Sequence, residues 1–141
     1  MTEDRYHLQR FVEAQTGVYE MARAELMAGE KRSHWMWFIF PQVAGLGYSS
    51  MAQRYAIGSI DEARAYLAHP VLGPRLRECA ALVNAVEGRS LARIFGSPDD
   101  LKFHSSVTLF AHAAEDADNV FQAALAKYFG GKEDAATVSR L

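Results

Sequence analysis

The feature that most constrains the fold of this chain is its longest apolar run, at positions 35–41. The run contains both tryptophans of the chain, Trp35 and Trp37, and the phenylalanines Phe38 and Phe40. In a helix, Trp37 and Phe38 share one side while Trp35 and Ile39 share another, so the segment is apolar nearly all round and must be largely buried. It is far shorter than the ~20 residues that a transmembrane helix requires. The run therefore predicts a core segment, and we expect no membrane partner.

The secondary structure of this run is the one ambiguous point in an otherwise helical pattern. Its aromatic and β-favouring residues would also suit a short strand. Because no second stretch of the chain is a strand candidate, a single strand would leave its backbone hydrogen-bonding groups unpaired. We therefore expect a helix here as well.

The rest of the chain shows apolar residues at helical spacing, bounded by glycine, proline and capping residues. Ser59 and Glu62, for example, form a capping-box pattern that opens a helix, and Pro70 ends it. The longer helical segments are 5–14, 18–28, 59–69, 73–88, 98–110 and 118–129, with shorter helical turns at 51–57 and 90–95. The sequence thus predicts an all-α fold of about six to seven helices, with no substantial sheet.

The length of 141 residues predicts one domain, because domains average ~150 residues. The sequence contains no linker, low-complexity stretch or internal repeat that would divide it. We expect a single compact domain over 1–141, with its core at about 5–130. Little apolar content remains after Gly130 and Gly131, so residues 131–141 are predicted to form a loose C-terminal tail or a short turn.

Composition and charge exclude several classes of protein. Half of the residues are hydrophobic and 23% are charged, which excludes a disordered chain. The lone cysteine, Cys79, lies on an apolar helix face and has no partner for an intramolecular disulfide. The polar first residues lack the apolar core of a signal peptide, so we expect a reduced, cytoplasmic protein. With a net charge of −2 and no basic stripe, the sequence predicts no nucleic-acid partner.

A candidate ligand pocket follows from the polar residues around the aromatic run. One interpretation of this segment is a central core helix whose tryptophans fill volume. The other is an aromatic-walled pocket that holds an anionic group, because cationic side chains embedded among aromatic ones are costly to bury unless something pairs with them. The candidate ligand-binding residues in this segment are Lys31, Arg32, His34, Trp35, Trp37, Phe40 and Gln42.

A second wall of the same pocket is predicted in the helix at 98–110. Helical spacing places Lys102 over the hydroxyls of Ser105 and Ser106, so this face is either simply solvated or completes the pocket. Between the two segments, Gly45–Ser50 is either an ordinary turn or an anion cradle at a helix N-terminus. The ligand that this combination predicts is a small anionic or nucleotide-like metabolite.

The sequence assigns no catalytic residue, metal ion or cofactor. No zinc-binding motif of histidines or cysteines occurs, and no serine lies in a nucleophile elbow. Possible acid–base residues are Glu25 and His34, together with Asp99 and Asp100. The two aspartates are better explained as first-turn residues that favour the positive end of a helix.

Five stretches of the sequence together resemble a known family. They are Lys31–Gln42, Gly45–Gly47, Tyr55–Ile57, Ala65–Leu76 and Phe95–Phe110. In these stretches the chain resembles the DUF1810 family, whose members are small, single-domain, mainly α-helical bacterial proteins of unknown function. The resemblance runs from about Leu8 to Phe129 and implies a helical fold without implying an activity. Two of the stretches contain the candidate pocket.

A fainter similarity is to the helical NADAR family of N-glycosidases, although no catalytic motif of that family matches residue by residue. Three functional hypotheses result. The first is binding of a small anionic or nucleotide-like metabolite. The second is a non-enzymatic interaction module or homodimer, in which an exposed part of the aromatic run docks a partner or a second copy of the chain. The third is N-glycosidase-like hydrolysis of ADP-ribose-type compounds.

Overall fold

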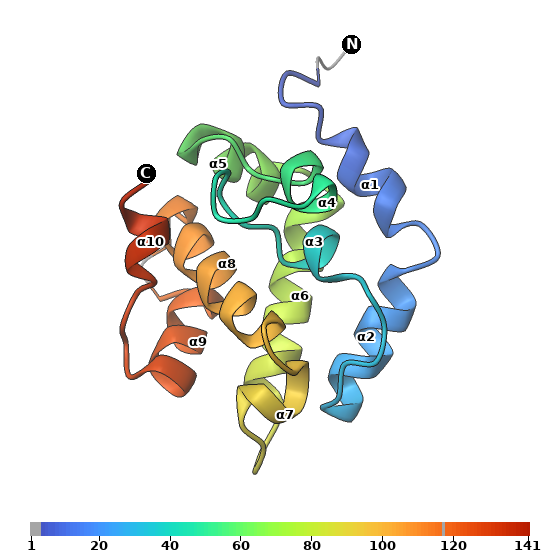
Figure 1. Ribbon diagram of the computed structural model, residues 1–141, viewed down its shortest axis with the longest axis vertical. Helices are drawn as coiled ribbons and strands as arrows, with labels where there is room; N and C mark the ends of the chain where they lie inside the picture. Colours follow the sequence, from blue (N-terminus) through green and yellow to red (C-terminus); the bar gives the residue numbers. More distant parts are fainter. Residues whose placement is uncertain (1–3, 117) are drawn as a thin grey trace.

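The computed structural model describes residues 4–116 and 118–141, and within these residues the chain forms ten helices and no strand. Six of the helices have seven or more residues, which confirms the predicted all-α fold. None of the helices in the described residues is long and apolar enough to cross a bilayer. The helices in Figure 1 are α1 (Gln9–Gln15), α2 (Tyr19–Ala28), α3 (Met36–Ile39), α4 (Ser50–Arg54), α5 (Ile60–Ala68), α6 (Leu72–Ala85), α7 (Leu91–Phe95), α8 (Asp99–Ala113), α9 (Val120–Phe129) and α10 (Ala135–Val138).

Two predicted helices are shorter than their apolar spacing indicates. Helix α1 begins at Gln9 rather than at residue 5, because the Asp4 carboxylate accepts the backbone N–H groups of Leu8 and Gln9 and holds the preceding residues in turns. Helix α4 ends at Arg54, and the residues that follow it pair with another part of the chain. At both helix ends, hydrogen bonds to another part of the chain take the place of further helical hydrogen bonds.

The aromatic run forms a helix, as predicted, but α3 is only one turn long. Trp35 is fully buried, and Phe38 and Phe40 are 8% and 1% exposed. The Phe40 ring meets the Phe103 ring edge-on, with 5.1 Å between the ring centroids. Of the two tryptophans, only Trp37 is partly exposed. The run is therefore part of the core except at this one indole.

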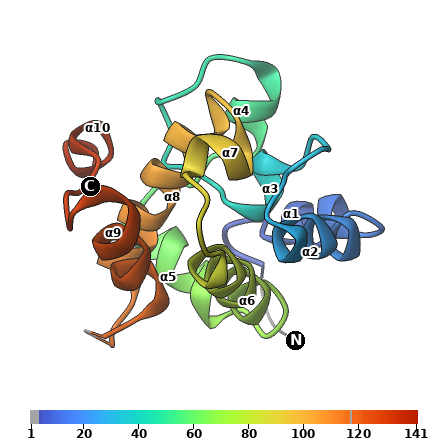
Figure 2. The ribbon, with the colours of Figure 1, turned by 90° about the horizontal axis from the view of Figure 1, so that it is seen from below.

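The core is organised around α8 and α6. Helix α8 buries nine of its residues and packs against α5, α7, α9 and α10, while α6 packs against α2, α5 and α9. Figure 1 shows α1 and α2 on one side of the molecule and α9 and α10 on the opposite side, with α6 and α8 between them. In Figure 2, which looks nearly along α6, helices α2, α5, α7 and α9 surround its axis.

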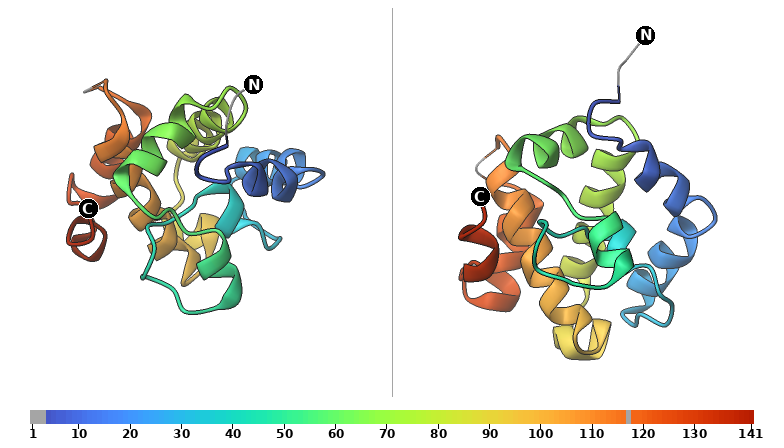
Figure 3. Two further views of the ribbon diagram at one scale, coloured as in Figure 1. Left: turned by 90° about the horizontal axis from the view of Figure 1, so that it is seen from above. Right: turned by 45° about the horizontal axis from the view of Figure 1, so that its top comes forward.

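The connection around α4 forms a wide loop that extends away from the other helices (Figures 2 and 3). Its two ends are joined by an isolated parallel bridge between Val43 and Ile57. The Ile57 N–H donates to the Gln42 carbonyl, and the Ala44 N–H donates to the Ile57 carbonyl, each at 2.8 Å. These bonds fix Gln42 beside α3 and close the loop at its base.

Of the two forms predicted for residues 131–141, a loose tail or a short turn, the C-terminal segment has the second. It contains α10, and Thr137 within this helix is fully buried. The Asp134 carboxylate accepts the hydroxyls of Ser105 at 2.8 Å and Thr137 at 2.6 Å, and the Asp134 N–H donates to the Thr108 hydroxyl at 2.9 Å. Polar contacts with α8 therefore dock a segment whose apolar content is low.

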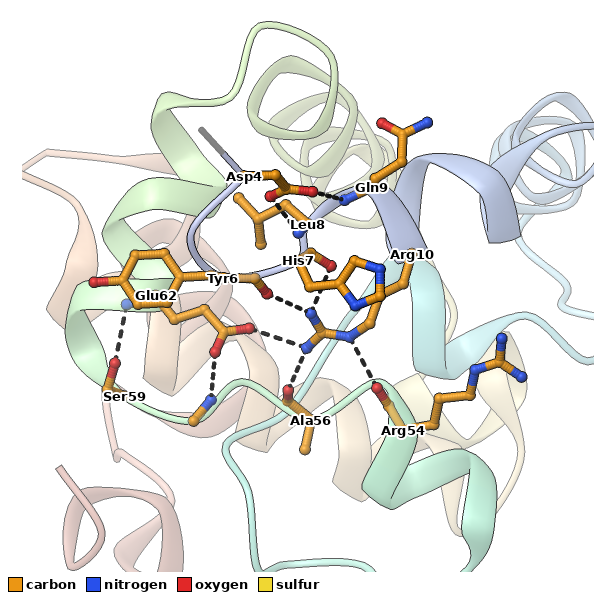
Figure 4. Close-up of polar contacts among 11 residues, drawn as sticks. Asp4, Tyr6, His7, Leu8, Gln9, Arg10, Arg54, Ala56, Ser59 and Glu62 are labelled. Atoms are coloured by element: carbon orange, nitrogen blue, oxygen red, sulfur yellow. Dashed lines mark hydrogen bonds and ion pairs between the residues drawn. The ribbon is translucent and has the colours of Figure 1, made fainter. Parts of the chain in front are cut away.

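A closed polar cluster joins α1 to the start of α5 (Figure 4). The Arg10 guanidinium donates five hydrogen bonds, to the Glu62 carboxylate and to the carbonyls of Tyr6, His7, Arg54 and Ala56. The other carboxylate oxygen of Glu62 accepts the Gly58 N–H at 3.0 Å, and the Glu62 N–H donates to the Ser59 hydroxyl at 3.1 Å, as the capping box predicts. Every guanidinium N–H of Arg10 is thus used to hold the backbone.

Candidate functional site

The positive charges of the candidate site lie on either side of one carboxylate. Lys31 Nζ is 2.8 Å from Asp99 Oδ2, and Lys102 Nζ is 3.4 Å from Asp99 Oδ1. The Lys31 side chain is only 7% exposed and also donates to the Ser33 carbonyl, whereas the Lys102 side chain is 27% exposed. The two walls predicted from sequence do meet in space. Two ammonium groups share one carboxylate, so this triad carries one surplus positive charge.

The Lys102 ammonium also lies over the Trp37 indole, 5.1 Å from the ring centroid. This is a cation–π contact, which holds the ammonium at the edge of the aromatic run. Together with Pro98, these two side chains line both of two adjoining hollows. We call them the small hollow and the large hollow, and the two together the groove.

The small hollow, of about 270 Å³, lies over the charged triad. Lys31, Asp99 and Lys102 line it, and His34 and Ser97 stand beside them. His34 is exposed, so its imidazole reaches the hollow from the solvent side. This hollow combines two ammonium groups, a carboxylate and an imidazole next to an indole.

The large hollow, of about 560 Å³, lies between α8, α10 and the loop before α4. Gln42 and the Gly47–Ser49 turn line one side, while Ser105 and Asp134 line the other. Tyr48 is 86% exposed at its edge. These elements lie next to one another in Figure 3, where the loop before α4 faces α8 and the C-terminal helix.

Six of the predicted ligand-binding residues come together at this groove, and the other four do not. The six that line it are Lys31, His34, Trp37, Gln42, Lys102 and Ser105. Trp35 is fully buried, and Phe40 reaches only a void of about 10 Å³ beneath the groove. Arg32 points away, with its side chain 74% exposed and paired with Glu30. Ser106 is fully buried, and its hydroxyl finds no hydrogen-bond partner within the described residues.

Glu25, a possible acid–base residue by sequence, is an anchor for the loop before α3. Its carboxylate accepts the Ser33 hydroxyl at 2.6 Å, the N–H groups of Arg32 and Ser33 at 2.7 and 3.0 Å, and the Trp35 indole N–H at 2.9 Å. Burial alone would raise the pKa of this carboxyl, but the hydrogen bonds outweigh it and hold the pKa below its ordinary value. With these acceptor sites filled, Glu25 positions the backbone at Arg32 and Ser33 and the indole of Trp35.

Three residues that contribute charge or a ring to the groove, Asp99, Tyr48 and Asp134, are not among the predicted ligand-binding residues. Asp99 had a sufficient local explanation in the first turn of α8, so its contact with Lys31 was missed. Asp134 lies in the segment expected to be a loose tail or a short turn. Tyr48 belongs to the Gly45–Ser50 stretch, where the Ser49 hydroxyl accepts the Ala52 N–H at 3.1 Å and caps α4. A tyrosine among glycines and serines was the one available signal.

The described residues show no further reactive centre. Among residues 4–116 and 118–141, no group of three His, Cys, Asp or Glu side chains could hold a metal ion. Cys79 is buried, and burial raises the pKa of its thiol to about 12. A thiol with such a pKa is almost entirely protonated at neutral pH, which fits its predicted place on an apolar helix face.

Comparisons with known proteins agree with the fold and add no activity. A family model described as "Protein of unknown function (DUF1810)" matches residues 5–141. The crystal structure of the conserved hypothetical protein Rv1873 from Mycobacterium tuberculosis is similar, with 59% sequence identity and a TM-score of 0.95. The similarity covers 98% of each chain. No curated protein matches the sequence.

Proposed function

Because the chain belongs to the DUF1810 family, whose function is unknown, we propose a function from the groove itself: it binds a small anionic metabolite that carries a flat ring. The observation that carries this proposal is the position of Lys102. Its ammonium lies between the two hollows and over a partly exposed indole, and it shares with Lys31 the one carboxylate partner that it has within the described residues.

The charge of the triad supports an anionic ligand. Asp99 is closer to Lys31 than to Lys102, at 2.8 Å against 3.4 Å, and the Lys31 side chain is the more buried of the two. The negative charge of Asp99 therefore compensates mainly the positive charge of Lys31. The positive charge of Lys102 is left largely uncompensated and can attract an anionic ligand. A phosphate or carboxylate group in the small hollow would form charge-assisted hydrogen bonds with it.

The aromatic residues of the groove support a flat ring. Trp37 is the one tryptophan with partial exposure, and Tyr48 projects at the edge of the large hollow on the same groove. Aromatic side chains gain contact energy from offset stacking on planar groups. The large hollow also has a volume within the range of about 300–1,000 Å³ that is typical of small-molecule sites.

The other two hypotheses have less support in this geometry. An interaction module needs a broad exposed apolar face, but Trp35, Phe38 and Phe40 are buried and leave Trp37 alone at the surface. A hydrolase needs a carboxylate that can act on substrate. Of the two carboxylates that line the groove, Asp99 is paired with lysines, and Asp134 accepts two hydroxyls through one oxygen, so the groove offers at most one available carboxylate oxygen and no carboxylate pair for acid–base catalysis.

A thermal-shift screen with nucleoside monophosphates, sugar phosphates and ADP-ribose tests the proposal. A ligand at 100 times its dissociation constant adds about 2.7 kcal/mol of stability and raises the melting temperature. We expect a shift from at least one of these anions, lost in Lys102→Gln and weakened in His34→Ala. Arg32→Ala is the matched control, because it removes a nearby positive charge that does not line the groove. No shift from any of these compounds, or a shift that survives Lys102→Gln, would contradict the proposal.

A further inference from the structure

We infer that the groove is divided into an anion subsite and a nucleoside subsite, and that its ligand is an adenine nucleoside monophosphate. The phosphate lies in the small hollow, and the base and ribose lie in the large hollow. This inference rests on the proposed function, since it assigns the two ends of the ligand to the two ends of the same groove.

The first argument is the distribution of charge along the groove. Lys102 lies at the junction of the two hollows. Beyond it, the small hollow adds the Lys31 ammonium, the Asp99 carboxylate and the His34 imidazole, which leaves a positive surplus there. The large hollow adds the Asp134 carboxylate instead. Because Lys102 also lines the large hollow, the charges of that hollow cancel, whereas the small hollow keeps one positive charge, so an anionic group is favoured at the small hollow.

The second argument is the pair of polar groups in the large hollow. Gln42 is partly exposed there, and its carbonyl is used by Ile57, while its side-chain amide forms no hydrogen bond within the described residues. A free amide offers a donor beside an acceptor, which is complementary to the N6 amino group and N7 of adenine. Guanine presents two acceptors at the corresponding positions and does not complement the amide in this way.

Asp134 is the hydrogen-bond acceptor for the hydroxyl groups of the ribose. Its carboxylate is held in place by the hydroxyls of Ser105 and Thr137. A carboxylate oxygen accepts more than one hydrogen bond, so Asp134 retains capacity for a sugar hydroxyl. An acidic side chain that accepts from ribose hydroxyls is a recurrent feature of nucleotide sites.

The third argument is the arrangement of the aromatic rings. Trp37 lines both hollows, and Tyr48 lies at the edge of the large one only. A base in the large hollow therefore has two aromatic side chains available for ring contacts, while Lys102 lines the same hollow for the phosphate end. A free sugar phosphate would leave these ring contacts unused.

Isothermal titration with adenosine monophosphate, guanosine monophosphate, ribose 5-phosphate and adenosine tests the inference at one fixed salt concentration. We expect adenosine monophosphate to bind about tenfold or more tightly than each of the other three, since one base contact and one charged contact are each worth about a factor of ten. Gln42→Leu should remove the preference over guanosine monophosphate and leave ribose 5-phosphate binding unchanged. Lys102→Gln should weaken the binding of all three phosphates and leave the binding of adenosine unchanged.

The outcomes separate this inference from the proposed function. If adenosine monophosphate and ribose 5-phosphate bind equally, the nucleoside subsite is wrong although the anion site stands. If Gln42→Leu weakens every ligand alike while circular dichroism shows a folded protein, Gln42 does not read the base. If none of the three phosphates binds, and the other sugar phosphates and ADP-ribose of the thermal-shift screen also fail, the proposed function itself is wrong.

Discussion

Two regions of this molecule contain a cation, a carboxylate and an aromatic ring in similar contact, and they differ in what remains unused. Arg10 is 3.0 Å from Glu62 and lies over the Phe11 ring at 4.5 Å from its centroid. Lys102 is 3.4 Å from Asp99 and lies over the Trp37 ring at 5.1 Å. All of the guanidinium N–H groups of Arg10 donate to protein acceptors (Figure 4). Within the described residues, Lys102 shares one carboxylate partner with Lys31 and lies beside two hollows.

The difference separates a structural cluster from a candidate binding site. In the Arg10 cluster, the carbonyl groups and the carboxylate satisfy the guanidinium completely, so a ligand has nothing to add. At Lys102, donor capacity and positive charge are left over. Burial and charge alone do not distinguish the two regions, but the count of satisfied donors does.

The largest expected effect is from Arg10→Ala. The side chains of Arg10 and Glu62 are 15% and 10% exposed, so removing one partner leaves a nearly buried charge, and we expect a loss of about 3 kcal/mol in the free energy of unfolding. Urea denaturation measures it. Arg23→Ala is the control, because the side chains of its pair with Glu78 are 41% and 43% exposed, and solvent screening makes such an exposed pair contribute much less than the Arg10 pair. If the two variants lose the same free energy of unfolding, the Arg10 cluster is not a special structural cluster and the contrast with Lys102 fails.

The helical fold was largely predictable from the sequence, and the reason is local. Apolar spacing, glycines and capping residues such as Ser59 act within a few residues, so they specify helices without knowledge of the tertiary fold. The docking of α10 was not predictable in this way. Its contacts through Asp134 and Thr137 are polar, so apolar content gave no signal.

The candidate site was predictable only in part, for the same reason. Lys102 and the aromatic run were identified because charged residues beside apolar ones are unusual. Which indole faces the groove depends on the packing of α3, and the sequence does not distinguish Trp35 from Trp37. Asp99 was missed because its partner Lys31 lies far away in the chain and a helix-start explanation was sufficient.

A smaller effect is expected from Glu25→Gln, and it depends on pH. Because the pKa of Glu25 is lower in the folded protein, this carboxylate stabilises the fold above its unfolded pKa of about 4.3, and that contribution is lost as the pH falls through the folded pKa. The variant should be less stable than the natural protein at pH 7 and should differ less from it in acid. Unfolding curves at several pH values show this. A constant difference at every pH would mean that the charge of Glu25 is unimportant.

Lys102→Gln should change stability still less, by under about 1 kcal/mol, because its side chain is partly exposed and Asp99 keeps Lys31 as a partner. The same variant should lose anion binding about tenfold or more, since hydrogen bonds to charged groups are worth about 1.5–3 kcal/mol. Calorimetry of unfolding and of binding tests both expectations. A large loss of stability in Lys102→Gln would mean that Lys102, like Arg10, has a structural role.

The smallest effect is expected from Tyr48→Ala. The side chain is 86% exposed, so the free energy of unfolding should stay within about 0.5 kcal/mol of the natural value. Ligand affinity should fall by several-fold through the loss of one ring contact, which is worth about 0.5–1.5 kcal/mol. Unchanged affinity would mean that Tyr48 does not contact the ligand and that Trp37 supplies the ring contact.

The most direct test of the groove uses Trp37 as its own reporter. In Trp35→Phe, Trp37 is the one remaining tryptophan, and acrylamide quenching of its fluorescence measures how open the groove is. Binding of adenosine monophosphate should cover the indole and reduce the quenching, and Lys102→Gln in the same background should abolish this protection. Quenching that is unchanged at saturating nucleotide, in a protein shown to bind it, would place the ligand elsewhere and contradict the account.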